Sequence, residues 1–363
     1  MRSFALSLAA IVSTFAAAPA AWAGDLAKPD ASKPDHTVKS SIETVVRGYI
    51  ATDTPVVLKI KSGDIVRIDT ISHGGITDDP IASFGAAGIS KSQVLPEVID
   101  VARVTKEKGW TGHVLTGPLY MEGAEPGDML EVRVLDIDIR VPYGVNNTGP
   151  TQGVVPGLVK EPTPKIIKFD LARNVALFSP EIEVPLAPFM GIMAVAPPPE
   201  VKRVPSRPPG VFGGNMDIKR FTAGSTLYLP VFNPGALFVT GDSHAAQGDG
   251  EVDGTAIEAS MTPTMQFVLH KGAGKNMAWP RGEDADFYYT MGMDEDLDKA
   301  MKEAVVETVK FLEGRGLSTA DAYALSSIGI DFIVGEAVDG VLLIYAAIPK
   351  SLFKTKTAYW AAK

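Results

Sequence analysis

The sequence predicts a mainly β protein, with a β-sandwich or barrel-like core that carries an internal duplication and a C-terminal α+β portion. Three observations support this fold class. Several segments alternate apolar with charged residues, which is the two-residue period of a strand. A glycine turn followed by a strand recurs along the chain. Helical spacing of apolar residues appears only near the C-terminus.

The clearest strands are at residues 64–69 and 130–140, where apolar and charged side chains alternate. This pattern is typical of a sheet with one face in water. Both segments, and a third strand-like run at residues 225–232, begin at a glycine turn. The repeated turn-then-strand unit favours a sandwich or barrel with internal duplication.

Helices are predicted late in the chain. Apolar residues repeat at helical spacing over residues 297–312, and Gly314 follows as a stop. A second helix is expected to begin after Ser318, which resembles the start of a capping box. Residues 330–337 and 341–348 flank an Asp-Gly turn and predict a closing β-hairpin.

Residues 1–23 have the composition of a signal peptide. Arg2 gives a positive start, an apolar run follows, and a small-residue cleavage pattern ends at Ala23. A membrane anchor is the alternative, but polar residues and a proline interrupt the run, which is shorter than the roughly 20 apolar residues a span requires. We therefore expect cleavage after Ala23 and a periplasmic or secreted protein.

The remaining chain divides into three parts by composition. Residues 24–40 are expected to be a flexible N-terminal segment, and residues 41–245 a mainly β domain. Within that domain, the prolines of residues 194–210 exclude helix and central strand and predict a long surface loop. Residues 246–363 form the predicted α+β C-terminal portion.

Composition also excludes several classes of partner and mechanism. The formal net charge of −9 is a poor match for phosphate backbones, so no nucleic-acid partner is expected. No segment after the signal peptide reaches membrane length, so no membrane partner is expected after cleavage. The chain has no cysteine, which excludes disulfides and a thiol nucleophile.

Residues 233–258 run from an apolar strand into a glycine-rich loop that concentrates acids around a histidine. Asp242 and His244 are two residues apart, so in an extended backbone their side chains share one face and suit a metal ion or an amide. The same spacing recurs at Asp249, Glu251 and Asp253. The alternative interpretation is an acidic surface loop, in which Thr255 and Glu258 cap a short helix.

Two further histidines lie among glycines, His73 shortly after Asp69, and His113. Each alone is more often a hydrogen-bonded structural histidine than a metal ligand. Ser243 lacks the G-x-S-x-G turn of a serine nucleophile, and the adjacent His244 would point to the opposite face of a strand. The site chemistry therefore favours an activated water over a side-chain nucleophile.

The block from Gly241 to Glu251 (GDSHAAQGDGE) resembles the acetamidase/formamidase family of amidohydrolases. Further similar blocks occur in the same order along the chain, at residues 116–120, 123–128, 213–217, 224–231 and 316–325. The resemblance covers nearly all of residues 45–350. It implies hydrolysis of a short linear amide to a carboxylate and ammonia, a largely β fold with an α+β C-terminal part, and a homo-oligomer, dimer or larger.

The resemblance also implies a divalent metal, zinc in the first instance and calcium as the alternative, with no organic cofactor. The expected metal ligands are Asp242, His244, Asp69 and His73. The expected catalytic residues are Glu251, Glu258, Asp217 and Asn215. The expected contacts with the small amide substrate are Gly241, Gln247, Gly248 and His113.

Two other functions fit the same residues. One is a hydrolase of the same fold that acts on cyclic amides, since the shape of the pocket decides between linear and cyclic substrates. The other is a non-catalytic periplasmic protein that binds a metal or sugar on a β-sandwich scaffold. The number of titratable groups in the loop at residues 242–258 favours an enzyme.

Overall fold

The structure is a computed structural model that describes residues 29–355 and residue 357. The predicted signal peptide, residues 1–23, and the start of the segment at residues 24–40 lie outside the described residues. Within residues 29–355, no helix combines the length and the apolar character needed to cross a membrane.

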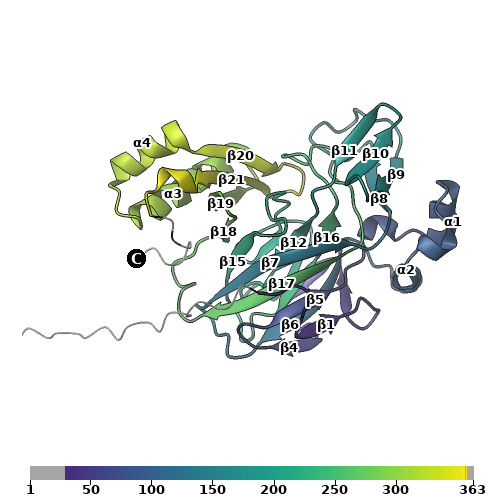
Figure 1. Cartoon of the computed structure of the whole chain (residues 1–363), viewed down its shortest axis with the longest axis horizontal. Helices are drawn as coiled ribbons and strands as arrows, with labels where there is room; N and C mark the ends of the chain where they lie inside the picture. Colours follow the sequence, from purple (N-terminus) through teal and green to yellow (C-terminus); the bar gives the residue numbers. More distant parts are fainter. Residues whose placement is uncertain (1–28, 356, 358–363) are drawn as a thin grey trace, which may run out of the picture.

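The largest sheet has nine strands and runs through the whole fold (Figure 1). Its order is β1 (His36–Val38), β5 (Ile65–Ile68), β17 (Met261–His270), β7 (Met129–Ile139), β15 (Thr226–Pro230), β18 (Arg281–Glu283), β19 (Phe287–Asp294), β21 (Leu342–Pro349) and β20 (Asp331–Glu336). All pairs are antiparallel except β1 with β5.

A second sheet has six strands. Its order is β14 (Gly213–Asn215), β12 (Phe189–Ala194), β16 (Phe238–His244), β6 (Val114–Met121) and β2 (Val45–Arg47), and β4 (Leu58–Ile60) also pairs with β6. Two smaller sheets complete the fold. They are β11 (Ile182–Pro185), β10 (Val175–Ser179), β9 (Thr163–Asp170) and β8 (Tyr143–Thr148), and the pair β13 (Arg203–Pro205) and β3 (Tyr49–Ala51).

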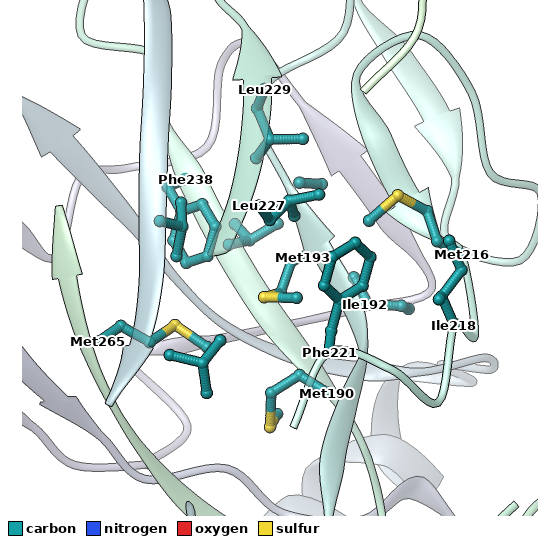
Figure 2. Close-up of a cluster of buried hydrophobic side chains, with 14 of the residues drawn as sticks. Met190, Ile192, Met193, Met216, Ile218, Phe221, Leu227, Leu229, Phe238 and Met265 are labelled. Carbon is teal, nitrogen blue, oxygen red and sulfur yellow. The ribbon is translucent and has the colours of Figure 1, made fainter. Parts of the chain in front are cut away.

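The main core fills the space between the nine-stranded and six-stranded sheets (Figure 2). Leu227 and Leu229 of β15 are fully buried there, together with Ile192 of β12 and Phe238 of β16. Two sheets that bury one face against each other form a sandwich. The mainly β, sandwich-like prediction is therefore confirmed, and all three predicted turn-then-strand segments belong to the nine-stranded sheet, as β5, β7 and β15. The internal duplication stays a prediction.

The predicted C-terminal elements are also present. They are α3 (Leu297–Glu313) and α4 (Thr319–Gly329), followed by the antiparallel pair β20 and β21. Ser318 caps α4, since its side chain accepts from the main-chain N–H of Asp321. Ala300 and Ala304 of α3 pack against Ile344 of β21, so both helices lie at the β18–β21 end of the large sheet (Figure 1).

The expectation that helices occur only late in the chain is wrong. Two earlier helices, α1 (Pro80–Ala86) and α2 (Pro96–Lys108), project from one end of the fold (Figure 1). Each begins with proline, which suits the first helical turn because that position needs no N–H donor. Three short 3-10 turns are η1 (His73–Gly75), η2 (Lys91–Gln93) and η3 (Lys350–Leu352).

The proline-rich segment at residues 194–210 is mostly irregular, as predicted, but it is not wholly a surface loop. Residues 195–197 are buried, and Arg203–Pro205 form the short strand β13. The division at residue 245 also crosses the large sheet, because β17 of the later part pairs with β5 and β7 of the earlier part. The division of the chain into domains at residue 245 therefore stays a prediction.

Candidate metal and catalytic site

The site is built around the end of β16, a strand that is buried along its whole length between β12 and β6. Asp242 and His244 do face each other, with His244 Nε2 3.2 Å from Asp242 Oδ2. The backbone at Asp242 is left-handed, with φ of 52°. The two side chains therefore meet where the backbone of β16 is locally left-handed, and not in the regular extended strand that the prediction assumed.

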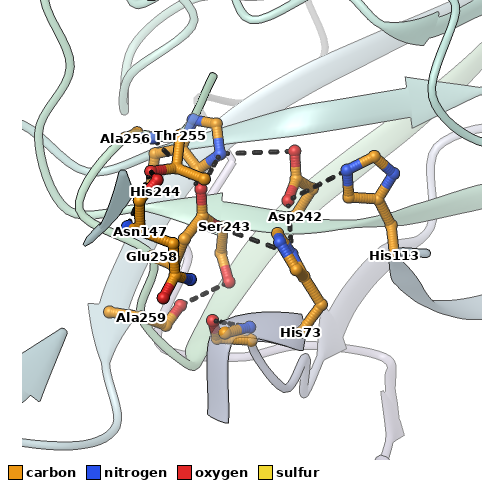
Figure 3. Close-up of polar contacts among 12 residues, drawn as sticks. His73, His113, Asn147, Asp242, Ser243, His244, Thr255, Ala256, Glu258 and Ala259 are labelled. Atoms are coloured by element: carbon orange, nitrogen blue, oxygen red, sulfur yellow. Dashed lines mark hydrogen bonds and ion pairs between the residues drawn. The ribbon is translucent and has the colours of Figure 1, made fainter. Parts of the chain in front are cut away.

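Two histidines from other parts of the chain approach the opposite oxygen of Asp242 (Figure 3). His73 of η1 places Nδ1 3.0 Å from Asp242 Oδ1, and His113, just before β6, places Nε2 3.8 Å from the same atom. The two rings meet edge to face with centroids 4.9 Å apart. The structure thus brings together three histidines that are far apart in the sequence.

Glu258 joins the two halves of this cluster. Its Oε1 lies 3.1 Å from His244 Nε2, and its Oε2 lies 3.7 Å from His73 Nδ1. Asp242 and Glu258 therefore each present one oxygen to His244 and the other to His73. Glu258, predicted as a general base, stands in this structure among the candidate metal ligands.

The arrangement fits a divalent metal. Four buried ligand atoms face one another or other ionisable groups but form no hydrogen bond of normal geometry, although buried polar atoms normally do; they are His73 Nδ1, Asp242 Oδ1, His244 Nε2 and Glu258 Oε2. The ligand atoms of His73, His113 and Asp242 lie within 4.8 Å of one another, as do those of Asp242, His244 and Glu258. Imidazole nitrogens and carboxylate oxygens are the ligands that zinc uses, and carboxylates also suit calcium.

A third group of possible metal ligands combines His244 with Asp217 and Glu251, and their ligand atoms again lie within 4.8 Å of one another. Gly191 of β12 leaves room between these groups. A Cβ there would collide with Asp217 Oδ1 and lie 2.8 Å from Asp242 Oδ2. Only glycine therefore keeps the space between the two carboxylates open.

Burial and charge shape the protonation of these groups. Burial raises the pKa of Asp217, and repulsion from Glu251 raises it further. Burial likewise raises the pKa of Glu251 well above its usual value, and the attraction of His244 offsets only part of this effect. Burial opposes a charge on Asp242, but His113 and His244 outweigh it and hold the pKa of Asp242 well below its usual value. The site thus contains carboxyl groups whose pKa values are shifted in opposite directions, upward for Asp217 and Glu251 and downward for Asp242.

Several predicted residues have other partners. Asp69 lies outside the donor groups found among the described residues, and its carboxylate contacts Lys39 Nζ at 3.0 Å and accepts from Thr262 Oγ1 at 2.8 Å. This geometry speaks against Asp69 as a metal ligand. His113, predicted to bind substrate, belongs instead to a group of possible metal ligands.

The predicted face shared by Asp249, Glu251 and Asp253 does not form. Asp249 accepts from the Tyr345 hydroxyl at 3.0 Å, and Asp253 accepts from Asn146 at 3.0 Å, so only Glu251 enters the site. The positive φ of 43° at Glu251 breaks the alternation that the prediction assumed. The argument against Ser243 is supported, because its buried Oγ donates to the Ala259 carbonyl at 2.6 Å.

The predicted glycines and amides lie close to the site. Gly241 packs against β6, where a Cβ would collide with the Val114 carbonyl, whereas Gly248 is exposed in the loop. Asn215 donates to Asp339 Oδ2 at 2.6 Å. Gln247 contacts His244 and the main chain of Asp217. Sequence reasoning missed Gly191, which lies near no histidine or recognisable motif, and it assigned Asp339 only to the turn of the closing hairpin.

Comparisons with known proteins point to one family. The model of the Acetamidase/Formamidase family matches residues 43–207 and 201–355. The chain is 29% identical to an acetamidase of Mycolicibacterium smegmatis over 44% of this chain and 54% of that protein. It is 25% identical to a formamidase of Methylophilus methylotrophus over 55% of this chain and 58% of that protein. These matches span less than two thirds of the curated relatives.

Solved structures match over more of their length. An acetamidase from Bacillus halodurans is 28% identical with a TM-score of 0.72, covering 87% of this chain and 99% of that chain. A γ-lactamase from Delftia acidovorans is 21% identical with a TM-score of 0.55, covering 89% of this chain and 95% of that chain. The second likeness concerns the fold alone.

Proposed function

The chain belongs to the acetamidase/formamidase family, and from that premise we propose that it cleaves the C–N bond of short linear amides such as formamide and acetamide. The products are a carboxylate and ammonia. The observation that carries the proposal is the convergence of possible ligand atoms from His73, His113, Asp242, His244 and Glu258 in two overlapping groups. Clustered titratable groups with shifted pKa values are typical of catalytic sites.

The mechanism requires a water made nucleophilic and a proton for the leaving amine. A divalent ion, when bound, lowers the pKa of a water and polarises a carbonyl. His73, His113, Asp242, His244 and Glu258 would hold it. Glu251 is the general base of the proposal, because its buried carboxyl lies in the same group as His244 and has a raised pKa. It takes the proton of the attacking water and returns it to the departing nitrogen.

The substrate enters, in this proposal, from the side of His73 and His113. Their side chains are 22% and 14% exposed, whereas those of Asp242, His244 and Glu258 are at most 3% exposed. Asp217 and Glu251 are also buried, with exposed fractions of 0% and 7%. A small amide that reaches the histidines would thus have the acids behind them.

The deciding experiment measures ammonia release by the purified mature chain from formamide, acetamide, propionamide and a γ-lactam. Turnover of a linear amide supports the proposal, and turnover of the lactam alone would favour the cyclic-amide alternative. No release from any amide by zinc-loaded protein would contradict both and favour a metal-binding protein. Product carboxylate, measured in the same samples, must equal the ammonia.

We further propose that the mature protein works in the periplasm or outside the cell, and as a homo-oligomer. The first proposal rests on the signal-peptide pattern of residues 1–23, and the second on the family resemblance. Cell fractionation with N-terminal sequencing tests the first, where a mature start at residue 24 is expected. Sedimentation of the purified chain tests the second, where a mass near the 38.5 kDa of a single full chain would contradict it.

A further inference from the structure

The side chain of Gln247 connects two parts of the candidate site. Its Oε1 lies 2.9 Å from His244 Nδ1, and its Nε2 donates to the main-chain carbonyl of Asp217 at 2.8 Å. A carbonyl oxygen only accepts hydrogen bonds, so the NH2 end of the amide must face Asp217. The orientation of the Gln247 amide is therefore determined by the network around it.

This orientation determines which nitrogen of His244 carries the hydrogen. Because Gln247 Oε1 has no proton to give, His244 Nδ1 must be the donor between them. In the neutral ring, which is the form that can bind a metal, the lone pair then lies on Nε2, the atom that faces Asp242 Oδ2 at 3.2 Å and Glu258 Oε1 at 3.1 Å in this structure. His244 has no exposed surface, and Phe189 packs against its ring at a centroid distance of 5.0 Å. Packing thus opposes a flip of the ring.

We propose that Gln247 is a positioning residue that fixes His244 as the Nδ1–H tautomer and thereby directs Nε2 toward a divalent metal. The inference rests on the proposed function, since it assumes the metal. Outer partners of this kind orient a histidine ligand, and their loss weakens metal binding about 10–100-fold. Both ends of the Gln247 amide are engaged by protein groups, which distinguishes this role from the predicted contact with substrate.

His113 provides an instructive comparison. Its Nδ1 lies 3.0 Å from the Ser206 hydroxyl, and its Nε2 faces Asp242. A hydroxyl both donates and accepts, so Ser206 leaves either tautomer of His113 possible. Gln247 alone of these two partners imposes a single tautomer.

Two substitutions separate the tautomer role from a simple anchoring role. Gln247→Met removes both hydrogen bonds at similar size, whereas Gln247→Glu keeps an acceptor opposite His244 Nδ1 and loses the donor to the Asp217 carbonyl. Zinc affinity of each purified full chain is measured by competition with a chelator, and circular dichroism checks folding. We expect Gln247→Met to bind zinc about 10–100-fold more weakly, and Gln247→Glu to stay within about threefold of the original chain.

A spectroscopic signature tests the tautomer directly in the unmodified protein. In zinc-loaded chain carrying 15N-labelled histidine, the His244 signal, identified by its loss in His244→Gln, should show the proton on Nδ1. This measurement holds even if Gln247→Met does not fold. A proton on Nε2 overturns the inference, as do equal losses of zinc affinity in the two Gln247 variants or no loss in Gln247→Met. If the original chain binds no divalent ion, the proposed metal chemistry fails first.

Discussion

At the scale of single residues, the site is defined by polar atoms that lack partners. His73 Nδ1, Asp242 Oδ1 and Glu258 Oε2 are buried and face one another without a hydrogen bond of normal geometry, and a buried polar atom left unsatisfied typically costs about 1–3 kcal/mol. A fold that accepts this cost in one place gains from it only when something binds there. The same three residues are therefore expected to matter more for function than for stability.

Glu251→Gln tests the general base. The amide keeps the size of the side chain but accepts no proton, so kcat for a short amide should fall about 10²–10⁴-fold. Zinc content, measured by atomic emission, should stay near that of the original chain. Asp249→Asn is the matched control from the same loop, since Asp249 contacts Tyr345 and Lys219 and not the site. Equal losses in both variants would argue against the assigned role of Glu251.

Glu336 predicts a pH dependence of stability. Burial, with repulsion from Asp339, raises the pKa of Glu336 from 4.5 to about 8. The folded chain therefore holds this proton where the unfolded chain releases it, so the stabilisation is complete below pH 4.5 and is lost as pH rises to about 8.

Urea unfolding of metal-free protein at several pH values measures this effect. The free energy of unfolding should fall on the order of 2–4 kcal/mol across that range. Glu336→Gln, which does not titrate, should remove most of the decline. A decline of the same size in the Glu336→Gln chain would assign the pH dependence to other groups.

At the scale of elements, β12 and β16 determine the shape of the site. The antiparallel register pairs Ile192 of β12 with Gly241 of β16 and Phe189 with His244, which places Gly191 opposite Asp242. Gly191 leaves space between Asp217 and Asp242. Strand β16 thus supplies Asp242 and β12 supplies the gap beside it, whereas Asp217 follows β14.

Gly191→Ala should lower zinc affinity and amide turnover without preventing folding. The added methyl group would occupy the space between the Asp217 and Asp242 carboxylates, so zinc affinity and amide turnover should both fall at least about tenfold. Gly85→Ala in α1 is the control, because a Cβ there meets nothing within 4 Å and alanine favours helix. Zinc affinity by chelator competition decides, and unchanged affinity in Gly191→Ala would contradict this account.

At the scale of the whole molecule, the C-terminal portion completes the surroundings of the site. Asp339, in the turn between β20 and β21, accepts from Asn215 at 2.6 Å and from Arg207 at 3.1 Å. Gly250 also forms a bridge with Glu336 of β20. The α+β portion and the six-stranded sheet are therefore joined at the candidate site. The geometry of the site should thus depend on the stability of both.

Removal of metal tests this coupling. A ligand that binds only the folded state adds about 2.7 kcal/mol at a concentration 100 times its Kd. Prolonged chelation should therefore abolish amide turnover and lower the thermal midpoint, and zinc should restore both. The His244→Gln chain should show a much smaller response. Full turnover after metal removal, verified by atomic emission, would contradict a metal-dependent mechanism.

The sequence by itself determined the fold class, the main strands, the two late helices and the closing hairpin. These features follow from local periodicity and turn chemistry, which depend only on residues that are close together in the sequence. It also predicted Asp242, His244, Glu251 and Glu258 as site residues, because they share one short segment, and the structure places these side chains close together. The α1 and α2 helices were missed, although each has a proline at its start, a position that suits the first helical turn.

Only the tertiary structure decided how the site is assembled. His73, His113 and Asp242 meet because η1 and the start of β6 lie beside the end of β16, and sequence spacing carries no information about such contacts. The structure also separated Asp69 from the site and revealed the gap at Gly191. The physical reason is that positive φ angles at Asp242 and Glu251 redirect their side chains, which alternation along an extended strand cannot predict.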